Sequence, residues 1–149
     1  RRYDWNTAYA EGWALYCESL GKELGLYSDP YQYMGALGDE IHRAIRLVVD
    51  VAIHTKNMSR EEAIQYMMDN EAIDEQGATA EIERYMAIPG QALAYKIGAM
   101  KITALRKKYE ASLGSKFKIS EFHDQVLKDG SLPLSVLEAK MDAWAASLK

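Results

Sequence analysis

The stretch Tyr9-Ala10-Glu11-Gly12-Trp13-Ala14-Leu15-Tyr16-Cys17-Glu18 predicts a helix that is apolar on nearly all sides. It carries two carboxylates, Glu11 and Glu18, whose seven-residue spacing equals two helical turns and places them on one face. No cation stands close to Glu11 on that face, and an ionised carboxylate without a partner on a buried helix costs free energy. Glu11 is therefore either a buried structural carboxylate or a ligand or catalytic group, and a metal ion is one candidate for compensating its charge.

Glu18 has a different setting in the sequence. Lys22 follows it by four residues, in the order that favours an ion pair along a helix. The simpler interpretation of Glu18 is thus a paired and partly solvated side chain. Cys17 is the single cysteine of the chain, which excludes an internal disulfide, and we expect it to be a small buried residue.

Composition excludes several classes of partner. The 149 residues carry a net charge of −4 at pH 7, so neither nucleic acid nor an anionic membrane is an expected partner. No apolar run is long enough to span a bilayer. Because the chain begins with Arg1 and not with Met, we expect that the true N-terminus is missing. The absence of a visible signal peptide then says nothing about the compartment.

The chain reads as a series of helices without strand-like alternation or an internal repeat. Capping residues mark the starts, as in Ser28-Asp29-Pro30 and in the capping box from Ser59 to Glu62, and Gly114 marks an end. We predict an all-α fold of about seven helices packed as an irregular bundle, in a single domain of residues 1–149. The expected helices run from about Asp4 or Asn6 to Tyr27, from Pro30 to about Thr55, from Ser59 to about Asn70, from Asp74 to Met86, from Pro89 to about Leu113, from Ser120 to before Gly130, and from Leu132 through Trp144.

The second expected helix carries a polar stripe. Arg46, Asp50 and His54 follow one another at intervals of four residues in an otherwise apolar segment. One interpretation is a buried ion pair between Arg46 and Asp50 that fixes the register of the helix. The other is that the stripe faces a functional site with His54 at its open end, although a histidine at a helix C-terminus is also favoured by the helix dipole.

A third polar feature lies at the start of the fifth expected helix. Gln91 and Tyr95 are four residues apart and share a face, among small residues such as Gly90 and Gly98. Small residues let a ligand or another backbone approach closely, and a tyrosine hydroxyl beside a glutamine can donate hydrogen bonds to an oxyanion. The alternative is tight helix packing in which the tyrosine reaches a buried acceptor.

These segments together resemble the bacterial domain-of-unknown-function family 885. The resemblance lies in the strings Ala8–Tyr16, Arg43–His54, Arg84–Gly98 and Phe122–Leu127, in order along essentially the whole chain. It corresponds to the C-terminal part of proteins that look like mainly α-helical zinc metallopeptidases of the gluzincin type. In such enzymes an H-E-x-x-H helix supplies two zinc ligands and a general base, and a glutamate from a second helix completes the site.

The resemblance implies a role for each candidate residue. Glu11 would be the third zinc ligand, and Glu18 would either orient the site from outside or be the ligand in its place. Tyr95 would stabilise the oxyanion during catalysis. The substrate cleft would be lined by His54, Arg84, Tyr85 and Gln91.

One departure limits what this chain can do. It contains no H-E-x-x-H, because His42, His54 and His123 are never four residues apart and none is followed by glutamate. We therefore predict zinc in a longer parent protein acting on short peptides, and neither bound zinc nor activity in this chain alone. A missing N-terminal region would supply the two histidines. The periplasm, a lipid anchor and the cytoplasm all stay open as locations.

A second hypothesis is not catalytic. The chain would be a helical ligand- or protein-binding domain whose polar stripes are ligand contacts or structural pairs.

If the rest of a longer protein packs against the apolar helices around Trp13 and Val48, we expect one of two properties in this chain by itself. It has either an exposed apolar surface or self-association that covers this surface.

Overall fold

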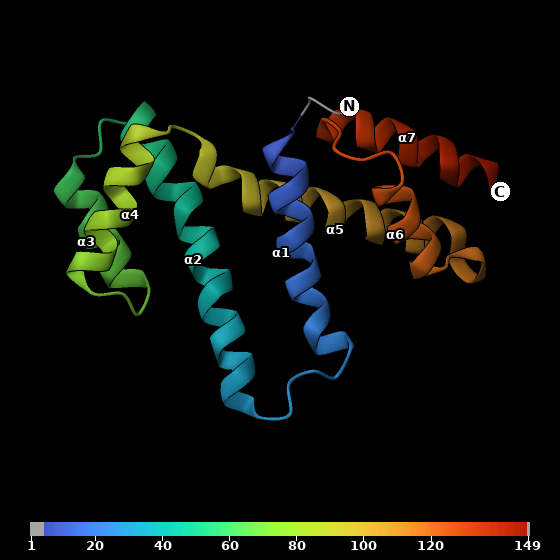
Figure 1. Cartoon of the computed structure of the whole chain (residues 1–149), viewed down its shortest axis with the longest axis horizontal. Coiled ribbons are helices and arrows are strands. Elements are labelled where there is room, and N and C mark those ends of the chain that lie inside the picture. The colour runs from blue at the N-terminus through green and yellow to red at the C-terminus, as the bar shows by residue number, and fades with distance from the viewer. Residues whose placement is uncertain (1–4, 149) are drawn as a thin grey trace.

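Seven α-helices and two short 3-10 helices make up the chain in the computed structural model, which describes residues 5–148 (Figure 1). No strand occurs among these residues, so the predicted all-α class is confirmed. Asp4, one of the two expected starts of the first helix, lies outside them. The elements are α1 (Thr7–Glu23), α2 (Pro30–Thr55), α3 (Arg60–Asn70), α4 (Glu75–Ala87), η1 (Gln91–Leu93), α5 (Ala94–Leu113), η2 (Gly114–Lys116), α6 (Ile119–Leu127) and α7 (Leu134–Ser147).

The first three helices begin where the sequence supplies a capping side chain. Asn6 caps α1 and Asp29 caps α2, each accepting a hydrogen bond from a backbone N–H of the first turn. Pro30 occupies the first position of α2, where its missing N–H has no cost. The predicted capping box of α3 is present, with Ser59 and Glu62 each bonded to the backbone of the other.

The end of α1 differs from the prediction. The helix stops at Glu23 and does not reach Tyr27, because Gly25 adopts a φ of 67° that a helix cannot continue. The N–H of Leu26 donates to the carbonyl of Gly21 over 2.9 Å, and the N–H of Gly25 donates to that of Lys22 over 3.2 Å. This pair of bonds is a Schellman motif, which satisfies the last carbonyls of the helix.

Three predicted helix starts are displaced, and one of them is that of α7, which begins at Leu134 and not at Leu132. The helix expected at Pro89 begins only with η1, because Gly90 has a φ of 80° in the left-handed region. Helix α6 begins at Ile119, one residue before Ser120, and the preceding Lys118 makes no side-chain capping bond. Ser120 is therefore not the cap that its position suggested.

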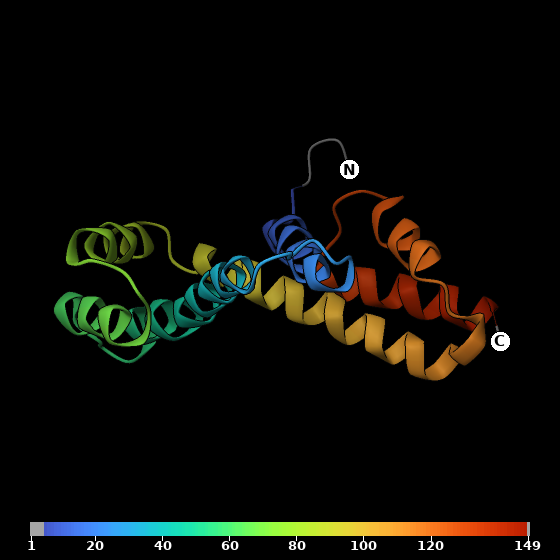
Figure 2. The same ribbon diagram turned by 90° about the horizontal axis from the view of Figure 1, so that it is seen from below.

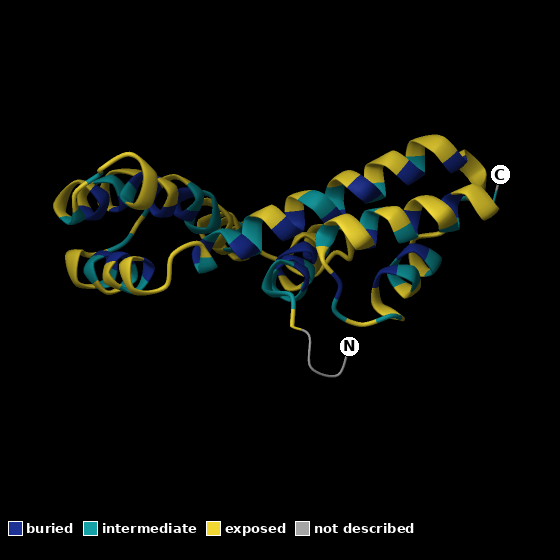
Figure 3. Cartoon of the chain, turned by 90° about the horizontal axis from the view of Figure 1, so that it is seen from above, coloured by how far each residue is buried: buried dark blue, intermediate teal, exposed yellow. Residues whose placement is uncertain are grey.

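The buried apolar residues form two separate clusters. The first joins α1 to α5, α6 and α7, and Tyr16, Tyr109 and Phe122 are among its fully buried side chains. The second joins the C-terminal half of α2 to α3, α4 and η1, around Met67 and Tyr85. Figure 2 shows the two groups of helices at opposite ends, joined where α2 approaches η1 and the start of α5. Buried residues, dark blue in Figure 3, lie on the inward sides of both groups.

Helices α1 and α5 touch backbone to backbone. A Cβ atom added to Gly12 would lie 2.3 Å from the Cα of Gly98. Only glycine at both positions allows this separation, since real Cβ atoms do not approach a backbone so closely. The crossing sets the turn of α1 that carries Glu11 against the turn of α5 that begins with Tyr95.

The sequence predicted an exposed apolar surface on the helix around Val48. Helix α2 has such a surface, and Val48 is one of its exposed residues. The N-terminal half of this helix extends away from α3 and α4 (Figure 1). Trp13 is partly buried instead, since it packs against the first cluster and its ring centroid lies 5.4 Å from that of His123. Within residues 5–148, no helix has both the length and the apolarity needed to cross a membrane.

Candidate functional site

Two arginines of α2 share one tyrosine ring of α5. The guanidinium carbon of Arg43 lies 4.6 Å from the ring centroid of Tyr95, and that of Arg46 lies 4.7 Å from it. Arg46 also lies 5.3 Å from the ring centroid of Tyr85, and Arg84 lies 5.0 Å from the same ring. These separations are those of cation–π contacts. We call these five residues the arginine–tyrosine cluster.

Arg46 is almost completely buried, with 1% of its surface exposed. Among the described residues, no hydrogen-bond acceptor reaches its Nε and Nη2 atoms, nor the Nε atom of Arg43. Burial lowers the pKa of Arg46 below its ordinary value, although the side chain stays charged at neutral pH. Glu81 acts on Arg46 only through its charge and not through a hydrogen bond. A buried cation without a directly bonded anion is unusual, because its burial costs free energy.

Arg46 and Asp50 do not form the ion pair that their spacing suggested. Both oxygens of the Asp50 carboxylate accept the backbone N–H of Gly90, each over 3.1 Å. The left-handed turn at Gly90 points this N–H toward α2. His54 lies at the open end of the stripe, with Nε2 3.7 Å from Asp50 and 3.1 Å from the carbonyl oxygen of Tyr85. The stripe thus ties α2 to the segment between α4 and α5.

Arg84 and Tyr85 converge on one carboxylate. Arg84 donates to Glu81 over 2.7 Å and to the side chain of Gln91 over 3.2 Å, and the hydroxyl of Tyr85 donates to the same oxygen of Glu81. Burial raises the pKa of the Tyr85 hydroxyl, and Glu81 raises it further. Burial opposes ionisation of Glu81, but the bonds from Arg84 and Tyr85 hold its pKa below the ordinary range.

One candidate cannot have the role that the resemblance implied. Tyr85 has no exposed surface and its hydroxyl is bonded to Glu81, so it supports the cluster and does not line a cleft. Side chains remain partly accessible at His54 (26%) and Arg84 (37%), and Gln91 and Tyr95 are half-buried. The structure therefore gathers the candidates of α2, α4, η1 and α5 into one region.

Glu11 and Glu18 lie apart from this cluster, on α1. Glu11 is half-buried and its carboxylate has neither a hydrogen bond nor an ion pair with the described residues. Glu18 is exposed and does not pair with Lys22, whose ammonium lies 4.6 Å from the ring centroid of Tyr33. In residues 5–148, no group of three or more His, Cys, Asp or Glu side chains could hold a metal ion.

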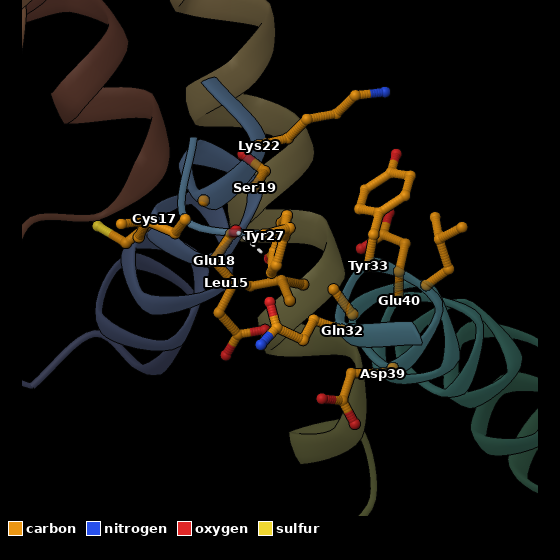
Figure 4. A pocket seen from close by; sticks show the side chains of 15 residues that line it. Leu15, Cys17, Glu18, Ser19, Lys22, Tyr27, Gln32, Tyr33, Asp39 and Glu40 are labelled. Atoms are coloured by element: carbon orange, nitrogen blue, oxygen red, sulfur yellow. Dashed lines mark hydrogen bonds between the residues drawn. The ribbon is translucent and has the colours of Figure 1, made fainter. Parts of the chain in front are cut away.

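A cleft of about 710 Å³ separates α1 from the N-terminal half of α2 (Figure 4). Cys17, which we expected to be buried, is exposed and lies on its wall. The hydroxyl of Tyr27 reaches the backbone carbonyl of Glu18 over 3.5 Å at the side of the cleft. The lining combines apolar and charged side chains, among them Leu15, Glu18, Lys22, Tyr33 and Leu37.

The sequence did not reveal Arg43 and Glu81 as residues of the region around the arginine–tyrosine cluster. It also did not reveal a separate hydrogen-bond network. Arg43 precedes Arg46 by three residues and Glu81 precedes Tyr85 by four, so helical spacing was the available signal. The separate network lies in the first cluster, where the Tyr16 hydroxyl and His123 Nε2 are 2.8 Å apart and Arg106 donates to that hydroxyl over 3.4 Å. Burial, and then the charge of Arg106, lowers the pKa of His123.

The fold and the site together define a class of protein: an all-α chain whose two groups of helices meet at the arginine–tyrosine cluster. Residues 1–141 match the family of bacterial proteins of unknown function, DUF885. The chain belongs to this family.

A solved structure is also similar to this chain. The crystal structure of "the putative lipoprotein from Colwellia psychrerythraea" shares 49% sequence identity with it, at a TM-score of 0.92. The match covers 95% of this chain and 24% of that protein. This chain therefore spans about a quarter of the length of that protein. The comparison with curated proteins gave no match.

Proposed function

We propose that this chain is the C-terminal part of a zinc-dependent peptidase for short peptides, in which Glu11 provides one metal ligand. The observation that carries this proposal is the crossing of α1 and α5. It brings the turn that carries Glu11, whose carboxylate has no partner among the described residues, into backbone contact with the turn that begins at Tyr95. Glu11 is a half-buried carboxylate with no partner in residues 5–148, and its turn packs against the turn of a tyrosine held between two arginines. Unbalanced charge of this kind is found at functional sites.

The residues of this chain do not by themselves fit a zinc ion. Zinc sites need three or four nitrogen, sulfur or oxygen ligands, and no such group exists among the described residues. His42 is bonded to Glu71 over 2.8 Å, and His54 is bonded to the backbone of Tyr85. Glu11 can therefore contribute at most one ligand, and the others would come from outside the chain. The chain alone would be inactive.

Residues in and beside the arginine–tyrosine cluster would bind and orient the peptide. Arg84, His54 and Gln91 keep accessible side chains that can donate hydrogen bonds to peptide carbonyls or to a terminal carboxylate. The hydroxyl of Tyr95 has no hydrogen bond with any described residue and is free to donate to a developing oxyanion. Tyr85 and Glu81 would hold Arg84 in place.

Metal content and peptidase activity of the longer polypeptide, measured beside those of this chain, test the proposal. We expect zinc and activity in the longer polypeptide and neither in the chain alone. Glu11→Gln removes the charged oxygen with little change of shape and should abolish zinc binding. Glu18→Gln is the matched control on the same helix and should keep the zinc. Full zinc occupancy in Glu11→Gln would remove Glu11 from the ligand set.

The second candidate function is that of a non-catalytic helical domain that binds a ligand or a protein. The cleft between α1 and α2 favours it, because its volume of about 710 Å³ and its mixed lining are those of a small-molecule site. A longer polypeptide without metal, whose ligand binding survives chelation, would support this function and overturn the peptidase.

A further inference from the structure

Helix α2 has two apolar faces, and only one of them is covered. Ile45, Val49 and Ala52 point into the second cluster and are buried. A second row of apolar residues runs along the same helix and lies outside both clusters, with Leu37 at the edge of the cleft beside α1. Its members are Met34 (70% exposed), Leu37 (48%), Ile41 (44%), Val48 (42%) and Val51 (37%), with the half-buried Ala44 between them. We call these six residues the α2 seam.

The spacing of the seam is that of a helix–helix contact. Its residues follow one another at intervals of three, four, three, four and three positions. This alternation places one apolar residue on the same side of a helix at each turn, as in the a and d positions of coiled coils. No charged residue interrupts the seam over its whole length. It extends for roughly 26 Å at 1.5 Å per residue.

We infer that the α2 seam binds an amphipathic α-helix from the remainder of the same polypeptide. A straight, narrow and uncharged row of this length matches the apolar stripe of another helix better than it matches a small ligand. The matched protein from Colwellia psychrerythraea has about three quarters of its length outside the region that this chain covers. A helix on the same polypeptide is present at high effective concentration, which favours it over a second copy of the chain.

This inference shares with the proposed function only the premise of a longer polypeptide. It requires neither zinc nor the arginine–tyrosine cluster, since no seam residue belongs to either buried cluster. A metal-free polypeptide with a covered seam would therefore overturn the peptidase and keep the docking helix. An active zinc enzyme with an open seam would do the reverse.

Photo-crosslinking in the full-length polypeptide tests the inference. A photoreactive side chain replaces Ile41 in the seam or, as control, the exposed Asp39, which stands about 200° away around the helix. At low protein concentration we expect intramolecular crosslinks from position 41 to a helix formed by residues outside this chain. The control variant with the photoreactive side chain at position 39 should not form these crosslinks. Crosslinks between two copies, or none from position 41, would overturn the inference.

A stability measurement keeps the inference testable if the photoreactive side chain disturbs the contact. Ile41→Asp places a charge in the middle of the seam. It should lower the Tm of the full-length polypeptide by about 5 °C, because the contact would bury an uncompensated charge. The Tm of the isolated chain should stay unchanged. Asp39→Ala is the control and should change neither. An equal loss in both polypeptides would show that the seam has no partner outside the chain.

Discussion

The carbonyl oxygen of Ala8 on α1 lies 1.9 Å from the point where a Cβ atom of Gly98 on α5 would stand. No side chain can share that position, so the glycine is required by the neighbouring helix and not by its own backbone. The contact lies between two turns that carry the candidate residues Glu11 and Tyr95. The separation between the turns of these two candidate residues therefore depends on the absence of a methyl group at position 98.

Gly98→Ala should destabilise the chain strongly. The new methyl group would clash with backbone atoms, which cannot rotate away as a side chain can, so we expect a loss of about 3 kcal/mol or more in the free energy of unfolding. Urea denaturation measures it. Gly38→Ala is the matched control in the interior of α2, where an added Cβ meets nothing within 4 Å. That control should stabilise the chain by about 0.5–1 kcal/mol. Similar effects of both changes would contradict the crossing.

Asp50→Ala should cost more than Asp50→Asn. Alanine removes both oxygens that accept the N–H of Gly90, which leaves a backbone donor unpaired at a cost of about 1–3 kcal/mol. Asparagine keeps one acceptor oxygen and should recover most of this. If Asp50 stabilised the fold by pairing with Arg46, the loss of its charge would matter instead, and the two variants would be equally unstable.

Arg46→Met should leave stability unchanged or raise it by roughly 1 kcal/mol, as found when buried charges are replaced by apolar side chains of similar size. The cation–π contacts with Tyr85 and Tyr95 are lost, but so is the cost of burying an unpaired guanidinium. Arg60→Met is the control at an exposed ion pair and should change stability little. A large loss at position 46 would mean that an anion is bound there.

Stability should fall as the pH is lowered from the ordinary histidine value toward the depressed pKa of His123. Burial, reinforced by the positive charge of Arg106, lowers that pKa in the folded chain. The unfolded chain then binds the proton more readily than the folded chain. The contribution of neutral His123 to the free energy of unfolding is therefore complete above about pH 6.5, and it is lost as the pH falls from there through the lower pKa of the folded chain. Thermal unfolding at a series of pH values measures this, and His123→Gln should flatten that part of the profile. An unchanged profile would assign the pH dependence to other groups.

The sequence was sufficient for the fold class and for most helix boundaries, because those depend on local signals. The capping residues Asp29 and Ser59 and the glycine at position 114 act within one helical turn. The errors arose where a neighbouring segment decided the outcome. Gly90 leaves the helical region while its N–H bonds to Asp50, which is forty residues away in the sequence.

The candidate site was predictable in part, for the same reason. Helical spacing placed Arg46, Asp50 and His54 on one stripe, but it could not show that Asp50 bonds to a backbone or that Arg46 lies between two tyrosines. These partners belong to other helices. Tyr85 was misjudged because its burial depends on α2 and α3, which its own sequence neighbourhood does not reveal.

The division of the core into two clusters implies an order of assembly during synthesis. Every buried residue of the second cluster lies between Ile45 and Ala92, so it can form as soon as that short segment has left the ribosome. The first cluster must instead bring α1 against α5, and Gly12 and Gly98 are separated by more than half of the chain. Helix α1 therefore waits, with its aromatic side chains uncovered, until α5 has been made, and this interval is when a nascent chain most needs a chaperone.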